Sequence, residues 1–223
     1  MLKFFKKYLM SNTAKATLLV LLILLADQAL KIWIKTHLTL GEEISILGKR
    51  GFIYFTENNG MAFGMEFFGN AGKFLLSIFR IIFIGVIGWY TWKQIRAKAP
   101  LGLVLGLAAM FAGALGNLID CLFYGLIFGE STYMQVAQMF PADGGYAPFL
   151  FGKVVDMFYF PIINITLPES FPFWSGERFI FFRPIFNVAD AAITLSVFYM
   201  LIFQRHIFSE KKAEESCERS VKI

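Results

Sequence analysis

Aspartate is the residue type whose placement in this 223-residue chain points most directly to chemistry. Asp156 and Asp190, two of the five aspartates, lack the basic neighbour one helical turn away on a predicted helix that Asp27 has in Lys31. Two carboxyls that share one water cannot both ionise readily, so one proton is held between them. The ionised member can then take a proton from the water while the protonated member polarises a peptide carbonyl, as in aspartic proteases. A proton- or ion-coupled transporter would also place acids inside a helix bundle.

Two further aspartates are predicted to have a positioning role. Lys31 follows Asp27 by four residues, so the two side chains share one helix face and can form an ion pair that orients the bundle. Asn117 and Asp120 are three residues apart and also share a face, where they can hold loops or each other.

The elements that must carry these residues are membrane spans. Hydrophobic residues make up 57% of the chain and charged residues 17%, which is unlike an ordinary soluble domain of this size. Four stretches approach the roughly 20 apolar residues that a transmembrane helix needs. They lie at about 16–36, 74–92, 101–123 and 186–204. The first is too long for a signal peptide and lacks a small-residue cleavage site, so we expect it to remain as an anchor.

Basic residues cluster on one predicted side of these spans and set their orientation. The clusters are Lys3, Lys6, Lys7 and Lys15, then Lys93, Arg96 and Lys98, then Arg205, Lys211, Lys212, Arg219 and Lys222. The positive-inside rule assigns them, and both termini, to the cytoplasm. Asp27, Asp120, Asp156 and Asp190 then converge near the outer surface of the membrane. A carboxylate at that depth is costly, so each is a functional candidate.

Two longer segments fall on the outer side, at about 37–73 and 124–185. The first has β-branched and aromatic runs around Gly48 and Gly51, which predict a short hairpin. The second is rich in proline, glycine and aromatic residues, and we expect its aromatic side chains to contact the lipid interface or a lipid-like ligand. We expect one membrane domain over 1–208, followed by a polar cytoplasmic tail at 209–223.

Several functional classes are disfavoured by composition. The net charge is +5, but the basic residues flank apolar runs instead of alternating with base-stacking aromatics, which argues against nucleic-acid binding. Cys121 and Cys217 cannot make a disulfide framework, and the two histidines add no metal-binding spacing. The sequence therefore predicts no metal site.

Five short motifs occur in order along these predicted elements. They are Asp27-Gln28 with Lys31, Asn58-Asn59-Gly60, Gly116-Asn117-x-x-Asp120, Val154-Val155-Asp156, and Phe186-Asn187-x-Ala189-Asp190. Together they resemble lipoprotein signal peptidase, the bacterial signal peptidase II family of membrane aspartyl proteases. The resemblance extends from about residue 20 to residue 200.

The resemblance implies a fold, a reaction and a set of site residues. The fold would be an all-α bundle of four transmembrane helices with a small extracytoplasmic β-cradle and a long aromatic-rich loop. The reaction would be removal of the signal peptide of a prolipoprotein before its diacylglyceryl-modified cysteine, without a cofactor, at the periplasmic face of the bacterial cytoplasmic (inner) membrane. Partners would be lipid-modified prolipoproteins, membrane lipids and the cyclic peptide inhibitor globomycin. Asp156 and Asp190 match the catalytic dyad, and the matching supporting or substrate-binding residues are Asn58, Gly60, Asn117, Asp120, Asn187, Asp27 and Lys31.

Two departures from the family pattern remain. Cys121 stands where the family's common pattern has an arginine, so Arg178, Arg183 or Lys153 would have to replace that charge, or substrate handling differs. The stretches on either side of Asp156 are also longer than the family norm. A small transporter or channel subunit, and a non-catalytic lipoprotein-binding protein on the same fold, are the alternative hypotheses.

Overall fold

The computed structural model describes residues 10–59, 69–166, 168–169 and 176–204. The chain forms two compact units. Unit 1 draws on Met1–Ala26, Phe79–Gly116 and Val188–Ile223, and unit 2 on Asp27–Ile78 and Asn117–Asn187. The predicted site residues divide between the two units.

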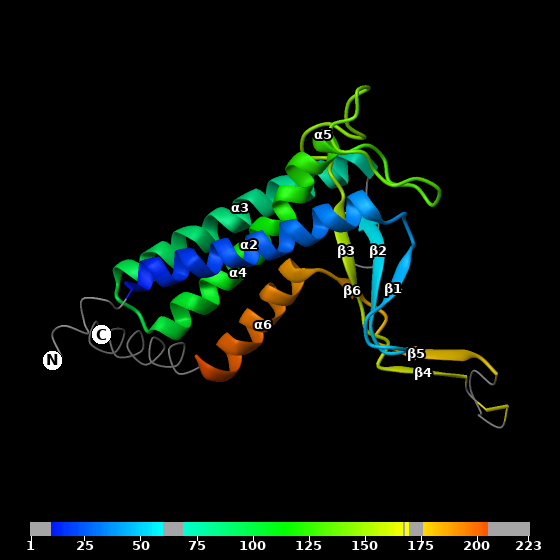
Figure 1. Cartoon of the computed structure of the whole chain (residues 1–223). Helices are drawn as coiled ribbons and strands as arrows, with labels where there is room; N and C mark the ends of the chain where they lie inside the picture. The colour runs from blue at the N-terminus through cyan, green and yellow to red at the C-terminus, as the bar shows by residue number, and fades with distance from the viewer. Residues whose placement is uncertain (1–9, 60–68, 167, 170–175, 205–223) are drawn as a thin grey trace. The chain divides into compact units, whose positions relative to one another are not determined.

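Apolar helices make up the largest part of the secondary structure among the described residues. Figure 1 shows α2 (Asn12–His37), α3 (Gly69–Arg96), α4 (Leu101–Ile119) and α6 (Val188–Phe203). The end of α4 continues through a π-helical turn, η2 (Asp120–Tyr124), into the short α5 (Gly125–Ile127). Three of the described helical stretches are long and apolar enough to cross a membrane, and they coincide with the first three predicted spans.

The fourth predicted span corresponds to α6, which has 16 residues. At about 1.5 Å per residue such a helix is about 24 Å long, which is shorter than the hydrocarbon core of a bilayer. A fourth crossing of the membrane therefore stays a prediction, and the predicted tail at 209–223 lies outside the described residues.

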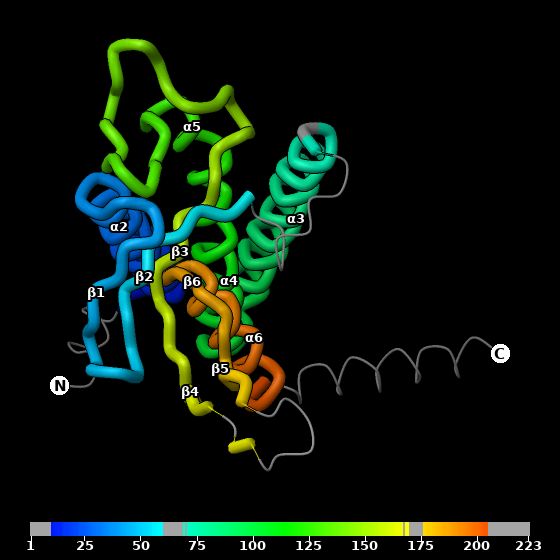
Figure 2. The backbone as a smooth tube through the Cα atoms, turned by 90° about the vertical axis from the view of Figure 1, so that its right-hand side faces the viewer, coloured from blue at the N-terminus to red at the C-terminus, as the bar shows by residue number. Residues whose placement is uncertain are grey.

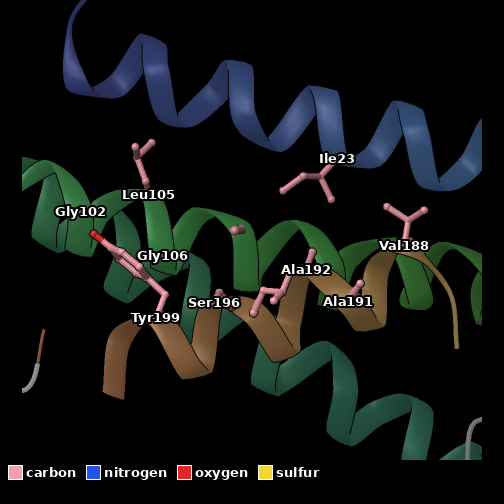
Figure 3. Close-up of a pocket in the computed structure, with 11 residues that line it drawn as sticks. Ile23, Gly102, Leu105, Gly106, Val188, Ala191, Ala192, Ser196 and Tyr199 are labelled. Carbon is pink, nitrogen blue, oxygen red and sulfur yellow. The ribbon is translucent and has the colours of Figure 1, made fainter. Parts of the chain in front are cut away.

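Small residues bring the helices of unit 1 close together. A side chain added at Gly113 of α4 would lie 2.4 Å from the carbonyl oxygen of Ala189 in α6, so only glycine permits this approach. Next to it is an open groove of about 580 Å³, whose lining is almost entirely apolar (Figure 3). The groove is lined by Ile23, Gly102, Leu105, Gly106, Ala109, Val188, Ala191, Ala192, Leu195, Ser196 and Tyr199.

Unit 2 is built around a four-stranded antiparallel sheet of order β1-β2-β3-β6 (Figure 1). Its strands are β1 (Glu43–Ser45), β2 (Phe52–Asn58), β3 (Val154–Tyr159) and β6 (Ile185–Phe186). The β1–β2 pair confirms the predicted hairpin. In the β2–β3 ladder, Ile53 pairs with Phe158 and Thr56 with Asp156, so β2 carries one extra residue between them.

A second, two-stranded sheet pairs β4 (Ile163–Thr166) with β5 (Arg178–Phe181). Its cross-strand pairs include Ile163 with Phe181 and Ile165 with Phe179, and all four side chains are exposed. Contact of these aromatic residues with lipid stays a prediction.

The segment after α5 packs back onto the end of the helix that precedes it, as Figure 2 shows. Backbone N–H groups of Gly152 and Ala147 donate to the carbonyls of Cys121 and Gly125, at 2.9 and 3.0 Å. These bonds satisfy carbonyl groups that a π-helical turn and a helix end leave free. A side chain added at Gly152 would lie 2.0 Å from the carbonyl oxygen of Asp120, so glycine is required at this contact.

Candidate active site

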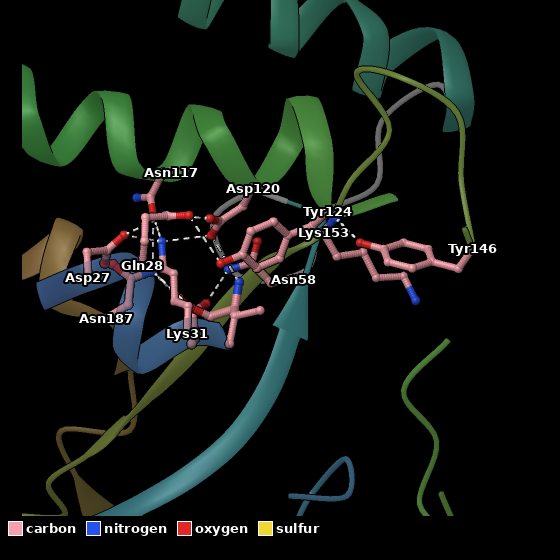
Figure 4. Close-up of polar contacts among 12 residues, drawn as sticks. Asp27, Gln28, Lys31, Asn58, Asn117, Asp120, Tyr124, Tyr146, Lys153 and Asn187 are labelled. Atoms are coloured by element: carbon pink, nitrogen blue, oxygen red, sulfur yellow. Dashed lines mark hydrogen bonds and ion pairs between the residues drawn. The ribbon is translucent and has the colours of Figure 1, made fainter. Parts of the chain in front are cut away.

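Lys31 is the centre of a buried polar cluster in unit 2 (Figure 4). Its side chain is 0% exposed, as are those of Asp27 and Asp120. The ammonium lies 2.9 Å from Asp27 Oδ2, 2.7 Å from Asp120 Oδ2 and 2.9 Å from Asn117 Oδ1. An ammonium has three protons, so these three acceptors satisfy it fully. The predicted Asp27–Lys31 pair is present, and Asn117 and Asp120 share a face as predicted.

Gln28 links the two carboxylates that flank Lys31. Its Nε2 donates to Asp27 Oδ2 at 3.1 Å and to Asp120 Oδ1 at 3.0 Å, and its Oε1 accepts from the Tyr124 hydroxyl at 3.2 Å. Two carboxylates and one ammonium leave an excess of negative charge, which amide and hydroxyl donors offset. Asp120 is therefore held rigidly, as a positioning group requires.

Asp156 lies beside this cluster, on β3, and is 3% exposed. The Asn58 amide donates to its Oδ2 at 2.6 Å, and the Asn187 amide donates to its Oδ1 at 2.7 Å. Asn58 comes from β2 and occupies the same face of the ladder as Asp156, because Thr56 is the cross-strand partner of Asp156. Hydrogen bonds from two amides favour the ionised form of a carboxyl. The geometry thus presents a buried, oriented carboxylate.

Asn187 and Asp120 connect the Asp156 strand to the Lys31 cluster. The Asn187 amide also lies 3.1 Å from Asn117 Oδ1 and 3.2 Å from the Val155 carbonyl oxygen. The Val155 N–H donates to Asp120 Oδ2 at 3.4 Å. Figure 4 shows labelled side chains converging from α2, from the end of β2, from the end of α4 and from Asn187 between β6 and α6. One network therefore fixes both β3 and the helix end.

The structure brings seven of the nine predicted site residues together in unit 2. They are Asp27, Lys31, Asn58, Asn117, Asp120, Asp156 and Asn187. Asp190 lies in the first turn of α6, in unit 1. Gly60 lies outside the described residues.

The position of the missing family arginine is filled without a charge. Cys121 is 1% exposed, inside the π-helical turn. Arg178 donates from Nε to Asn164 Oδ1 across the β4–β5 pair, and the Lys153 ammonium lies 3.5 Å from Glu57 Oε2. Of the basic residues that the structure describes, Lys31 is the one with an ion pair to Asp120.

A second buried ionic cluster, which sequence reasoning missed, lies around Glu57. Lys35 forms an ion pair with Glu57 Oε1, and its ammonium lies 2.8 Å from the Ser131 hydroxyl and 4.9 Å from the centre of the Tyr146 ring. The backbone N–H of Lys153 donates to the Tyr146 hydroxyl at 2.7 Å, and burial raises the pKa of that phenol. Lys35 follows Lys31 by four residues, so Asp27, Lys31 and Lys35 form one polar stripe on α2 that could have been found from spacing alone.

Known proteins resemble this chain over most of its length. A family model described as signal peptidase (SPase) II matches residues 19–206. A lipoprotein signal peptidase of Porphyromonas gingivalis is 43% identical over 185 residues, covering 82% of this chain and 80% of that protein. A lipoprotein signal peptidase of Amoebophilus asiaticus is 33% identical over 188 residues, covering 83% and 75%.

Solved structures agree in fold. One, described as a bacterial membrane enzyme structure obtained by the in meso method at 2.3 Å resolution, has a TM-score of 0.56 and 22% identity. The match covers 88% of this chain and 91% of the chain in that structure. At this identity the likeness concerns the fold, whereas the family model and the curated relatives concern descent. The three span-length helices and these relatives make the protein a multi-pass membrane protein, and the chain belongs to the signal peptidase II family of proteases.

Proposed function

We propose that this protein is an aspartic endopeptidase that removes the signal peptide from diacylglyceryl-modified prolipoproteins. Asp156 and Asp190 form the catalytic pair, and they activate a water that attacks the peptide bond before the lipidated cysteine. The reaction takes place at the outer face of the bacterial cytoplasmic membrane. Membership of the signal peptidase II family supports the substrate class.

The observation that carries the mechanism is the double amide clamp on Asp156. Asn58 and Asn187 hold one carboxyl oxygen each, at 2.6 and 2.7 Å. A carboxylate offers about four acceptor positions, so these bonds are compatible with acceptance of a proton from water. An orientation fixed from both sides is what general-base catalysis needs, because the base must stay within hydrogen-bond reach of the proton it removes.

The sequence position of Asn187 supports Asp190 as the second acid. Only Val188 and Ala189 separate Asn187, which contacts Asp156, from Asp190 in the first turn of α6. The start of α6 is thus tethered to a residue of the clamp. A pair of carboxyls sharing one proton would supply both the general base and the general acid that peptide hydrolysis requires.

The proposed topology has four spans, with both termini in the cytoplasm. Lys93 and Arg96 lie in the last turn of α3 and Lys98 in the short connection to α4, and the positive-inside rule places this end of the two helices in the cytoplasm. The β-sheet segments between α2 and α3 and between α4 and α6 then face outward. Asp156, on β3, would lie at the depth where the lipid anchor of the substrate holds the scissile bond.

Cleavage of a synthetic diacylglyceryl-modified precursor by the purified protein in detergent tests the proposal. We expect Asp156→Asn and Asp190→Asn each to abolish cleavage while thermal unfolding stays within a few degrees of wild type. Asp143→Asn is the matched control, because Asp143 is exposed in a loop, and it should cleave normally. Turnover by either Asp156→Asn or Asp190→Asn would overturn the catalytic pair.

Globomycin provides a second readout of the same site. We expect it to inhibit cleavage by the wild-type protein and to bind both inactive variants. Tight binding of the precursor without hydrolysis by wild type would favour the lipoprotein-binding alternative. Ion- or substrate-dependent flux through reconstituted vesicles, without cleavage, would favour the transporter.

A further inference from the structure

The end of β2 that carries Asn58 has little backbone support of its own. Between the extra residue of β2 and its last residue, the pairs with β3 are Thr56 with Asp156, Glu57 with Val155, and Asn58 with Val154. A bulge weakens the ladder on one side of these three pairs, and the strand ends on the other. Such a strand end opens readily unless side chains hold it.

The side chain of Glu57 supplies an anchor at this point. Glu57 and Asn58 are consecutive strand residues, so their side chains project to opposite faces of the sheet. Ser131 donates to Glu57 Oε1 at 2.8 Å, Lys35 forms an ion pair with the same oxygen, and Lys153 approaches Glu57 Oε2 at 3.5 Å. Glu57 is 3% exposed and Lys35 is 0% exposed, so water does not weaken this anchor as it would at the surface.

The anchor draws on three separate segments of unit 2. Lys35 lies in the last turn of α2, Ser131 in the segment after α5, and Lys153 directly before β3. The Lys35 ammonium also faces the Phe128 and Tyr146 rings, at 5.4 and 4.9 Å from their centres. Two further charged groups act on the cluster: Glu130, 3.9 Å from Lys153 and largely exposed, and the buried Asp120 carboxyl, which attracts the Lys35 ammonium. The position of Glu57 is therefore fixed relative to the helix, the loop and β3 at once.

We propose that Glu57, held by Lys35 and Ser131, is a positioning residue for catalysis, which fixes the Asn58 amide on Asp156 by locking the end of β2. This inference rests on the proposed function, because it assigns a role in the same reaction. The Asn58–Asp156 bond is 2.6 Å long, and a displacement of about 1 Å would take it outside the range of hydrogen bonds. Misplacement on that scale lowers rates steeply without removing any catalytic group.

The test replaces Glu57 and its two buried partners, Lys35 and Ser131, by apolar side chains. Lys153 is partly exposed and keeps Glu130 as an ion-pair partner, so no charge of the anchor is left fully buried and unpaired. Replacing a buried ion pair with apolar residues of similar size is often neutral for stability, whereas removing one partner is not. The triple variant Lys35→Met, Glu57→Leu, Ser131→Ala should therefore fold with a thermal midpoint near that of wild type. We expect its kcat to fall at least about ten-fold, with KM nearly unchanged.

The pH profile separates positioning from a general loss of stability. The Asn58 N–H stabilises the ionised form of the Asp156 carboxyl, so loosening this bond should move the acidic limb of the kcat profile to higher pH. The double variant Lys35→Met, Glu57→Gln keeps an acceptor for the Ser131 hydroxyl and should recover part of the lost kcat. Glu42→Gln, at an exposed glutamate of unit 2, is the matched control and should leave kcat and the profile unchanged.

Two further measurements show whether the effect passes through Asn58. If it does, adding the triple substitution to Asn58→Ala should lower kcat little further than Asn58→Ala alone. The effects of substitutions at residues that act through one chain of contacts are not additive. Hydrogen exchange of residues 56–58 should accelerate in the triple variant whether or not the protein cleaves any substrate. No cleavage by wild type would refute the proposed function while leaving the exchange measurement intact. The positioning role of Glu57 would be overturned if the triple variant had the kcat, the pH profile and the hydrogen exchange of wild type.

Discussion

The Lys31 ammonium lies 2.7 Å from Asp120 Oδ2, and neither side chain is exposed. The two residues belong to different helices, far apart in sequence, and the same ammonium also contacts Asp27 and Asn117. All three protons of this ammonium are bonded to side-chain acceptors in a buried site, so water does not take the place of these acceptors. Lys31 therefore ties the C-terminal half of α2 to the end of α4.

Substitution of Lys31 should be among the most damaging changes in the chain. Lys31→Met leaves two buried carboxylates without their cation, and loss of one partner of a buried ion pair costs about 3–5 kcal/mol. We expect a large fall in the thermal midpoint in detergent, together with loss of activity. Lys49→Met, at an exposed lysine, should change neither. A wild-type midpoint for Lys31→Met would contradict the structural role assigned here.

Asn187 is expected to be intolerant of a negative charge. In Asn187→Asp, a carboxylate would replace the amide that lies 2.7 Å from Asp156 Oδ1, so repulsion replaces a hydrogen bond. We expect cleavage at neutral pH to fall at least about a hundred-fold, since one donor to a reacting group is worth about that factor. Asn164→Asp, at an exposed asparagine of β4, makes the same chemical change as a control. Equal cleavage activity of Asn187→Asp and Asn164→Asp would refute a role in cleavage for the hydrogen bond between Asn187 and Asp156.

A methyl group at Gly152 should disrupt the packing behind Asp120. The added carbon would meet the Asp120 carbonyl oxygen at 2.0 Å, and both partners are backbone atoms that cannot rotate away. Overpacking of this kind typically costs about 1–3 kcal/mol. Thermal unfolding of Gly152→Ala should show it, whereas Gly129→Ala, where the nearest atom is 3.7 Å away, should behave like wild type.

The Tyr146 hydroxyl should affect stability differently at neutral and alkaline pH. Tyr146→Phe removes the acceptor of the Lys153 N–H, which costs about 1–3 kcal/mol at neutral pH. Burial raises the pKa of Tyr146, so stability from the neutral phenol is complete below the unfolded value near 10 and is lost as pH rises above it. The difference in thermal midpoint between wild type and Tyr146→Phe should therefore become smaller above about pH 10. Tyr133→Phe, at an exposed tyrosine, should follow wild type throughout; a constant gap for Tyr146→Phe would contradict the burial effect.

Local patterns predicted much of this fold. Apolar length located the three span-length helices, and the runs around Gly48 and Gly51 predicted the β1–β2 hairpin. A spacing of four predicted the Asp27–Lys31 pair, because neighbours on a helix face are set by helix geometry alone. The motif order then identified the residues that gather around Asp156.

The remaining features depend on contacts that sequence spacing does not encode. The Lys35–Glu57–Ser131 cluster joins α2, β2 and the segment after α5, and nothing local to any of them predicts the other two. The π-helical turn at Asp120–Tyr124 has no sequence signal comparable to a proline or a glycine. The return of residues 146–152 to the helix end follows from satisfying carbonyl groups in three dimensions.

The single extra residue in β2 decides which side chain meets the Asp156 carboxyl. With an uninterrupted ladder continuing from Ile53 and Phe158, Glu57 would stand opposite Val154, where Asn58 now stands. An acid would then face Asp156 in place of an amide, and the asparagine would point toward the lysines. Deleting one residue from this part of β2 would thus replace the amide donor to Asp156 with a repelling carboxylate, although the residues around both sites would stay the same. Insertions and deletions in this strand therefore matter more than most point substitutions.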